Sequence, residues 1–240
     1  KKIDTVTGGF EKYSLEFELT EAPKKDIMII YGIFSGAGQI LIDDIYLGTE
    51  ENIKYSAADF PDTVFIGLSK SANETFYDDT PDDGKGGFAD LGKDMSMIKT
   101  GYNKINGVPF YIQEKKDVKS CVILGGAKRP NLPKSITLLL TDGDFSKIGF
   151  LYTSLWVKAK KGDKLGAIIV NFQNGVKEEI AMIFKENIFD WYLPTFKDDS
   201  PKNLFLFDSP DHIGRALFTL VWKNNKKSGI KSIEFVSDGN

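Results

Sequence analysis

The stretch LGAIIVNFQNGVKEEIAMIF, residues 165–184, is the part of the chain that indicates its fold most directly. It contains two apolar-rich runs, residues 165–172 and 178–184, on either side of the sequence Gln173-Asn174-Gly175. Runs of this length that are rich in Ile and Val and bounded by an Asn-Gly turn are typical of β-strands. The stretch therefore predicts a strand, a turn and a second strand.

Similar runs occur along the whole chain, and turn sequences such as Thr141-Asp142-Gly143-Asp144 and Lys161-Gly162-Asp163 separate them. Residues 13–19 alternate apolar and polar side chains with period two, which is the pattern of a half-buried strand. No amphipathic pattern of three helical turns is visible in the sequence. Many short strands at this spacing predict an all-β fold, an antiparallel β-sandwich or jelly roll. The other predicted strands are residues 26–34, 39–47, 63–68, 108–112, 120–124, 135–140, 148–157, 216–222 and 230–236.

Charge and hydropathy exclude several classes of function. The chain has 240 residues and a formal net charge of −3, with acidic and basic residues interspersed. This balance gives no electrostatic basis for binding nucleic acid or an anionic membrane, and no apolar run reaches the ~20 residues that a membrane span needs. We therefore expect neither a nucleic-acid partner nor a membrane span. The chain starts within a strand-like pattern and without a signal peptide, so we expect a mature or excised fragment.

The residues that could support catalysis are sparse. Cys121 and His212 are the only cysteine and histidine, and nothing near either one suggests a nucleophile with its base. Two adjacent carboxylate pairs, Asp43-Asp44 and Glu178-Glu179, lie in predicted strands, where neighbouring side chains point to opposite faces. Neither pair can flank one glycosidic bond. We assign no catalytic residue and favour a non-enzymatic role.

The first 50 residues differ from the rest in organisation, and a boundary is expected near residues 49–60. Three strands are too few to close a sandwich. Residues 1–50 are therefore either the C-terminal half of a jelly-roll module or extra strands docked on the main domain. Residues 60–240 are expected to form a β-sandwich domain.

Two segments resemble known carbohydrate-binding modules. The run GQILIDDIYL, residues 38–47, is similar to the closing strand of jelly-roll modules that bind carbohydrate. The run FYDDTPDDGKGGFADLG, residues 76–92, resembles a segment of β-sandwich modules attached to bacterial glycoside hydrolases and polysaccharide lyases. Where those modules carry Trp after Gly-Gly, this chain has Phe88. Further similarity lies in NGVPF (106–110), FLYTSLW (150–156), NIFDWY (187–192) and LVWKN (220–224).

This resemblance implies a galactose-binding-like jelly roll in an exported protein, extracellular or at the cell surface. It further implies a non-catalytic module that binds polysaccharide or oligosaccharide and accompanies other domains of the same chain. Because a fold does not determine a function, a structural cell-surface or S-layer-type module is the alternative. A glycoside hydrolase or polysaccharide lyase is less favoured. The sequence does not discriminate among β-glucans, xylans, mannans and uronate polymers.

The aspartate- and glycine-rich loop at residues 78–94 is a candidate metal site. Ca²⁺ takes six to eight hard oxygen ligands, and a glycine-rich backbone can arrange them. Asp79, Asp83 and Asp90 are the predicted ligands. The alternative is a solvated acidic turn in which Asp side chains accept hydrogen bonds from nearby backbone N–H groups.

The aromatic residues divide into predicted core and predicted ligand contacts. Trp156 and Trp222 lie in predicted strands, which favours core positions. Trp191 and Tyr192 precede a proline-containing loop, and Tyr102 lies in a predicted loop, so their rings are expected to reach solvent. Flat aromatic faces can stack on sugar rings, and polar neighbours bind the hydroxyl groups. The predicted ligand-binding residues are Trp191, Tyr192, Tyr102 and Asp190.

Overall fold

The structure is a computed structural model, and the described residues belong to one compact unit, Asn52–Asn240. The predictions for residues 1–50, including the resemblance at residues 38–47, lie outside the described residues. The boundary near residues 49–60 therefore stays a prediction. The described residues are 54–68, 70–78, 80–84, 87–92, 95, 97–113, 117–140, 144–192, 203–207, 214–226 and 228–239.

Antiparallel strands dominate the described residues, and the only helix among them is a three-residue 3-10 turn, η1 (Ala57–Asp59). The predicted all-β antiparallel sandwich is therefore confirmed, whereas the galactose-binding-like subtype stays a prediction. No helix in this described part is both long and apolar enough to cross a membrane. The strands are β1 (Gly101–Ile105), β2 (Val108–Ile112), β3 (Ser135–Leu139), β4 (Lys147–Tyr152), β5 (Lys164–Phe172), β6 (Lys177–Ile183), β7 (Leu204–Phe207), β8 (Arg215–Lys223) and β9 (Ile230–Ser237).

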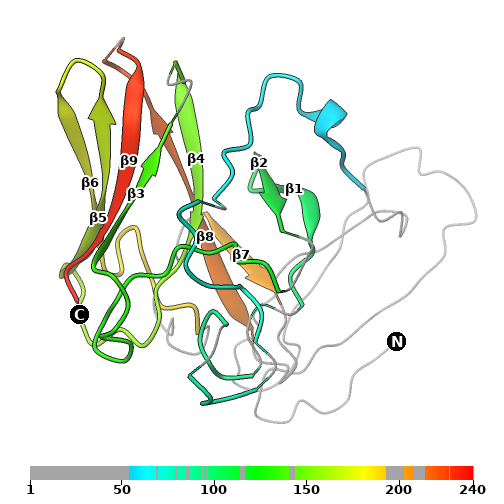
Figure 1. Ribbon diagram of the computed structural model, residues 1–240, viewed down its shortest axis with the longest axis vertical. Helices are drawn as coiled ribbons and strands as arrows, with labels where there is room; N and C mark the ends of the chain where they lie inside the picture. The colour runs from blue at the N-terminus through cyan, green and yellow to red at the C-terminus, as the bar shows by residue number, and fades with distance from the viewer. Residues whose placement is uncertain are drawn as a thin grey trace, which may run out of the picture. The chain divides into compact units, whose positions relative to one another are not determined.

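Two sheets form the sandwich, one with the order β3-β9-β5-β6 and one with the order β4-β8-β7 (Figure 1). Residues 165–184 form the predicted hairpin, β5 paired with β6. On its other side β5 pairs with β9. The two strands lie so close together at Gly166 that a Cβ atom on this residue would overlap the carbonyl oxygen of Val236. The buried core between the sheets consists of Ile148, Phe150, Leu165, Ile168, Val170, Phe172, Met182, Phe184, Ile188, Trp222, Ile230 and Ile233.

The outer face of the three-stranded sheet is covered as well. Leu217 of β8 and Phe207 of β7 pack in a second cluster with Phe76, Met95 and Ile98. Beside them, a Cβ atom on Gly149 of β4 would meet the side chain of Val108, in the β1–β2 hairpin. Because both of its faces are covered, β8 has five consecutive buried residues from Arg215 to Thr219.

Three of the predicted strands differ from the structure. Residues 63–68 and 120–124 form no strand, apart from an isolated bridge between Cys121 and Glu74. The predicted strand at 148–157 ends at Tyr152. Beyond that point Ser154 bridges Asp190, and Trp156 adopts a φ of 51°. Apolar runs predict burial, but a strand also needs a neighbour that supplies ladder hydrogen bonds.

Candidate functional site

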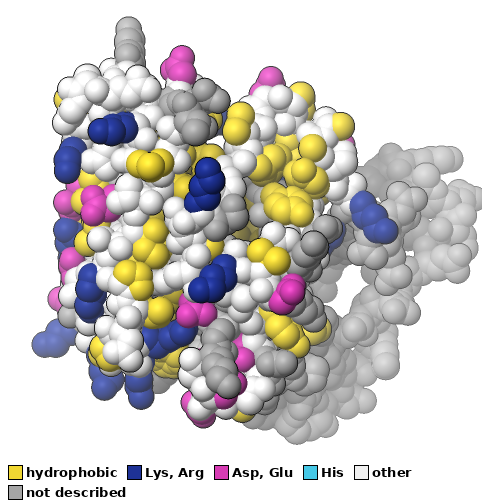
Figure 2. All heavy atoms as spheres, viewed as in Figure 1, with side chains coloured by type: hydrophobic (Ala, Val, Ile, Leu, Met, Phe, Trp, Pro, Cys, Tyr) yellow, Lys and Arg dark blue, Asp and Glu magenta, His cyan; other side chains and the backbone are white. Residues whose placement is uncertain are grey.

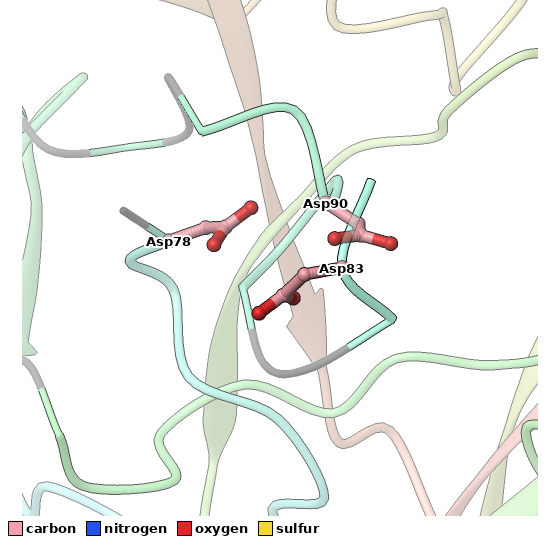
Figure 3. Close-up of side chains that lie close together, drawn as sticks. All are labelled: Asp78, Asp83 and Asp90. Carbon is pink, nitrogen blue, oxygen red and sulfur yellow. The ribbon is translucent and has the colours of Figure 1, made fainter. Parts of the chain in front are cut away.

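Three carboxylates of the aspartate-rich loop lie close together. One carboxylate oxygen from each of Asp78, Asp83 and Asp90 lies within 4.8 Å of the others. Figure 3 shows the Asp78 side chain pointing toward the loop that carries Asp83 and Asp90. Two of the three predicted ligands are thus in the cluster, with Asp78 as its third member. Asp79, the remaining predicted ligand, lies outside the described residues.

Backbone geometry holds the cluster in place. Asp78 is buried, and its two carboxylate oxygens accept hydrogen bonds from the N–H groups of Thr80 (3.1 Å) and Gly92 (3.0 Å). Gly92 has a φ of 62°, and a Cβ atom there would lie 2.6 Å from the ring of Pro81, so this position requires glycine. The two hydrogen bonds and the close approach of Gly92 to Pro81 therefore hold the Asp78 side chain in place.

Asp90 has one satisfied carboxylate oxygen and one without a partner. Its Oδ2 accepts a hydrogen bond from Gly84 N (3.2 Å). Its Oδ1 is shielded from solvent and accepts no hydrogen bond within the described residues. A buried acceptor without a partner costs about 1–3 kcal/mol, and three nearby carboxylates repel one another. A bound cation would offset both costs, so this acidic cluster has the donor chemistry to hold a metal ion.

The predicted ligand contacts around residue 190 are largely buried. Trp191 is 3% exposed, with its ring 5.4 Å from Phe88 and 4.8 Å from the guanidinium of Arg215. The expectation that its ring faces solvent is wrong, because β8 and the 76–92 segment cover it. A buried ring has no free face for a sugar. Tyr192, by contrast, is 36% exposed.

Asp190 joins two loops. It is 8% exposed, and its carboxylate accepts hydrogen bonds from Tyr192 N (3.0 Å) and Val157 N (3.1 Å). Burial raises the pKa of Asp190, while these N–H groups and the positive charge of Arg215 oppose the rise. The predicted contact of Asp190 with a ligand hydroxyl does not fit this environment, because both oxygens are already used within the fold.

Tyr102 lies in a strand, β1, and not in the predicted loop. It is directly opposite Tyr111 of β2, with the ring centroids 4.9 Å apart. A two-stranded hairpin can bury one face and expose the other, so a strand position and access to solvent are compatible here. Tyr111 is 43% exposed. Ring contacts continue the series from Tyr102 to Phe65, Phe60 and Tyr55 at 5.2, 6.0 and 5.3 Å.

A furrow runs beside this aromatic series. Its volume is about 1270 Å³, and residues 62–68, β2, residues 119–129 and the β4 region contribute to its lining. Aromatic side chains in the lining include Phe65, Phe110, Tyr111 and Trp156. Figure 2 shows hydrophobic side chains gathered over the part of this unit that contains β1 and β2. The lining of the furrow is thus largely apolar and reaches buried core residues such as Ile168 and Ile233, and it also contains polar side chains such as Gln113 and Asn106.

The two remaining tryptophans have different environments. Trp222 is 7% exposed and belongs to the sandwich core, as predicted. Trp156 is half-buried beyond the end of β4 and lines the furrow. Sequence reasoning did not identify Tyr111, and it placed Asp78 in the candidate metal loop without naming it among the three predicted ligands. The Asn106-Gly107 dipeptide, with both φ values positive (49° and 79°), is the turn signal from which the pairing of Tyr102 with Tyr111 could have been inferred.

No protein-family model, curated protein or solved structure matches this chain.

Proposed function

We propose that this chain is a non-catalytic carbohydrate-binding module that binds polysaccharide in the furrow beside β2. The observation that carries the proposal is the combination of a furrow of about 1270 Å³ with an exposed aromatic ring in its lining, Tyr111. Sugar rings present C–H faces that pack against aromatic rings, while the side chain of Gln113 and the side-chain oxygen of Asn106 can bond hydroxyl groups. The resemblance of residues 76–92 to accessory modules of polysaccharide-degrading enzymes supports the same role, in an exported protein.

Replacing Tyr111 with Ala is expected to weaken polysaccharide binding by about 1–3 kcal/mol, by analogy with base–aromatic stacking. Because Tyr111 is exposed, the fold should tolerate the change. Affinity electrophoresis against xylan, β-glucan, mannan and polygalacturonate measures the effect. The comparison variant Tyr192→Ala removes an exposed ring that does not line the furrow.

Weaker binding by Tyr192→Ala with unchanged binding by Tyr111→Ala would place the ligand at the surface predicted from the sequence. If wild-type protein binds none of the four polysaccharides, the structural-module alternative replaces this proposal. Release of reducing ends or unsaturated products from any of them would instead indicate an enzyme.

We further propose that the metal ion held by the acidic cluster is Ca²⁺. Asp78, Asp83 and Asp90 offer only carboxylate oxygens, which are the hard ligands that Ca²⁺ prefers, and neighbouring backbone carbonyls can complete its coordination. The ion would stabilise residues 78–92. These residues precede Met95 and Ile98, which pack on the outer face of the three-stranded sheet. The proposed role is therefore structural support for the sandwich.

Calcium in 100-fold excess over its dissociation constant is expected to stabilise the protein by about 2.7 kcal/mol, because it binds only the native state. Thermal unfolding in calcium and in chelator measures this difference. Asp83→Asn should abolish the response, and Asp83 is exposed, so its replacement disturbs the fold little. Asp117→Asn, an exposed aspartate outside the cluster, should retain it. The same melting temperature in calcium and chelator for wild-type protein would contradict a calcium site.

A further inference from the structure

Two lysines face each other on the outer face of the three-stranded sheet. The antiparallel register places Lys147 of β4 directly opposite Lys223 of β8. Directly paired residues of antiparallel strands point to the same side of the sheet, and like charges in such a pair destabilise it. Both lysines are exposed, and neither takes part in an ion pair within the described residues. A negatively charged group bound between them would relieve the repulsion.

One lysine of this pair lines the furrow, and the other is its cross-strand neighbour beside that lining. Lys147 lines it, and so does Val221, which is two residues from Lys223 on β8 and 42% exposed. On the face seen in Figure 2, basic side chains lie between the sandwich and the hydrophobic side chains over the β1–β2 hairpin. Lys147 and the aromatic rings of Phe65 and Tyr111 therefore line the same furrow.

The charge of the furrow is opposite to that of the whole chain. Its described lining contains four basic residues and two acidic ones, whereas the chain has a formal net charge of −3. Arg129 is engaged by Glu74 at 3.2 Å. The remaining basic side chains are exposed ammonium groups on flexible stems, which suit contact with anions spaced along a polymer. The basic residues are Lys119, Lys128, Arg129 and Lys147, and the acidic ones are Asp62 and Asp144.

We infer that the furrow selects an anionic polysaccharide, a chain of sugars that bear carboxylate groups, over neutral chains. This inference rests on the proposed carbohydrate-binding function. Sugar rings pack against Tyr111 and Phe65, and carboxylates of the same chain reach Lys147 and Lys223. A cleft with one sign of charge concentrates ligands of the other sign. Lys119 and Lys128 extend the positive charge along the furrow.

The test compares two polymers with the same backbone. Polygalacturonate carries free carboxylates, and highly methyl-esterified pectin carries few, so any difference in affinity reports the charge. Wild-type protein is expected to prefer polygalacturonate, and added salt should reduce this preference because exposed charges are screened. The double variant Lys147→Gln/Lys223→Gln should bind polygalacturonate about tenfold more weakly, or about threefold per lysine, the size expected for exposed ion pairs.

The matched control is Lys177→Gln, an exposed lysine on β6 that does not line the furrow. It should bind like wild type. Because Lys147 and Lys223 are exposed, the double variant should fold, and its melting temperature at low salt should equal or exceed that of wild type.

Equal affinity of wild type for the two polymers would overturn the preference for anionic chains and leave the proposed function intact. An unchanged affinity of the double variant for polygalacturonate would also overturn the inference. If wild type binds neither these polymers nor neutral xylan, β-glucan and mannan, the proposed function fails together with this inference.

Discussion

Replacing Trp222 with Ala is expected to lower the free energy of unfolding by about 3–5 kcal/mol, the cost of removing a large core aromatic side chain. The Trp222 ring is 7% exposed, packs 6.1 Å from the ring of Phe172 and spans from β8 to the facing sheet. There its Nε1 donates a hydrogen bond of 2.8 Å to Glu178 Oε1 of β6. Truncation would leave a cavity between the sheets and remove that donor from Glu178.

Denaturant unfolding monitored by circular dichroism measures this loss. Val221→Ala, on the same strand but 42% exposed, should change stability by no more than about 0.5 kcal/mol. Trp156→Ala is expected to cost less than Trp222→Ala, because Trp156 is only half-buried outside the core cluster. A Trp222→Ala protein as stable as wild type would show that the two sheets do not pack around this ring.

Replacing Asp190 with Ala is expected to destabilise the protein by about 1–3 kcal/mol for each of the two backbone N–H groups that lose their buried acceptor. The change leaves Tyr192 N and Val157 N without their acceptor. It also leaves the positive charge of Arg215, which is 3% exposed, without this nearby carboxylate. Chemical denaturation at neutral pH is the measurement. Destabilisation below about 1 kcal/mol would contradict a structural role for Asp190.

The variant Asp190→Asn tests the titration of this carboxyl. Burial raises the pKa of Asp190 in the folded state, so the native protein binds the proton more tightly than the unfolded chain does. The contribution of this pKa difference to the free energy of unfolding is fully present below the pKa of the unfolded state. It is lost as the pH rises through the pKa of the folded state. The stability of wild type relative to Asp190→Asn should therefore decrease across this acidic window and stay constant above it. An increase over the same window would contradict the direction of the pKa shift.

The local sequence determined the strand pattern and part of the acidic cluster. Residues 165–184 predicted the β5–β6 hairpin, because apolar runs and an Asn-Gly turn act within a single segment. Asp83 and Asp90 were predicted together for a similar reason. They are seven residues apart in a loop with positive φ values at Asp82, Gly84 and Asp90, and such a short loop keeps its side chains close. Trp222 was correctly placed in the core from its position in a strand.

Contacts between distant segments decided the rest. Trp191 follows a strand-like run before a predicted loop, but Phe88 and Arg215, each more than twenty residues away, cover its ring. Tyr102 pairs with Tyr111 on the exposed face of a hairpin whose other face packs on β4. Lys147 and Lys223 are neighbours only through the register of β4 and β8. Periodicity in one segment reports which side chains share a face, whereas burial of that face depends on which other segment packs against it.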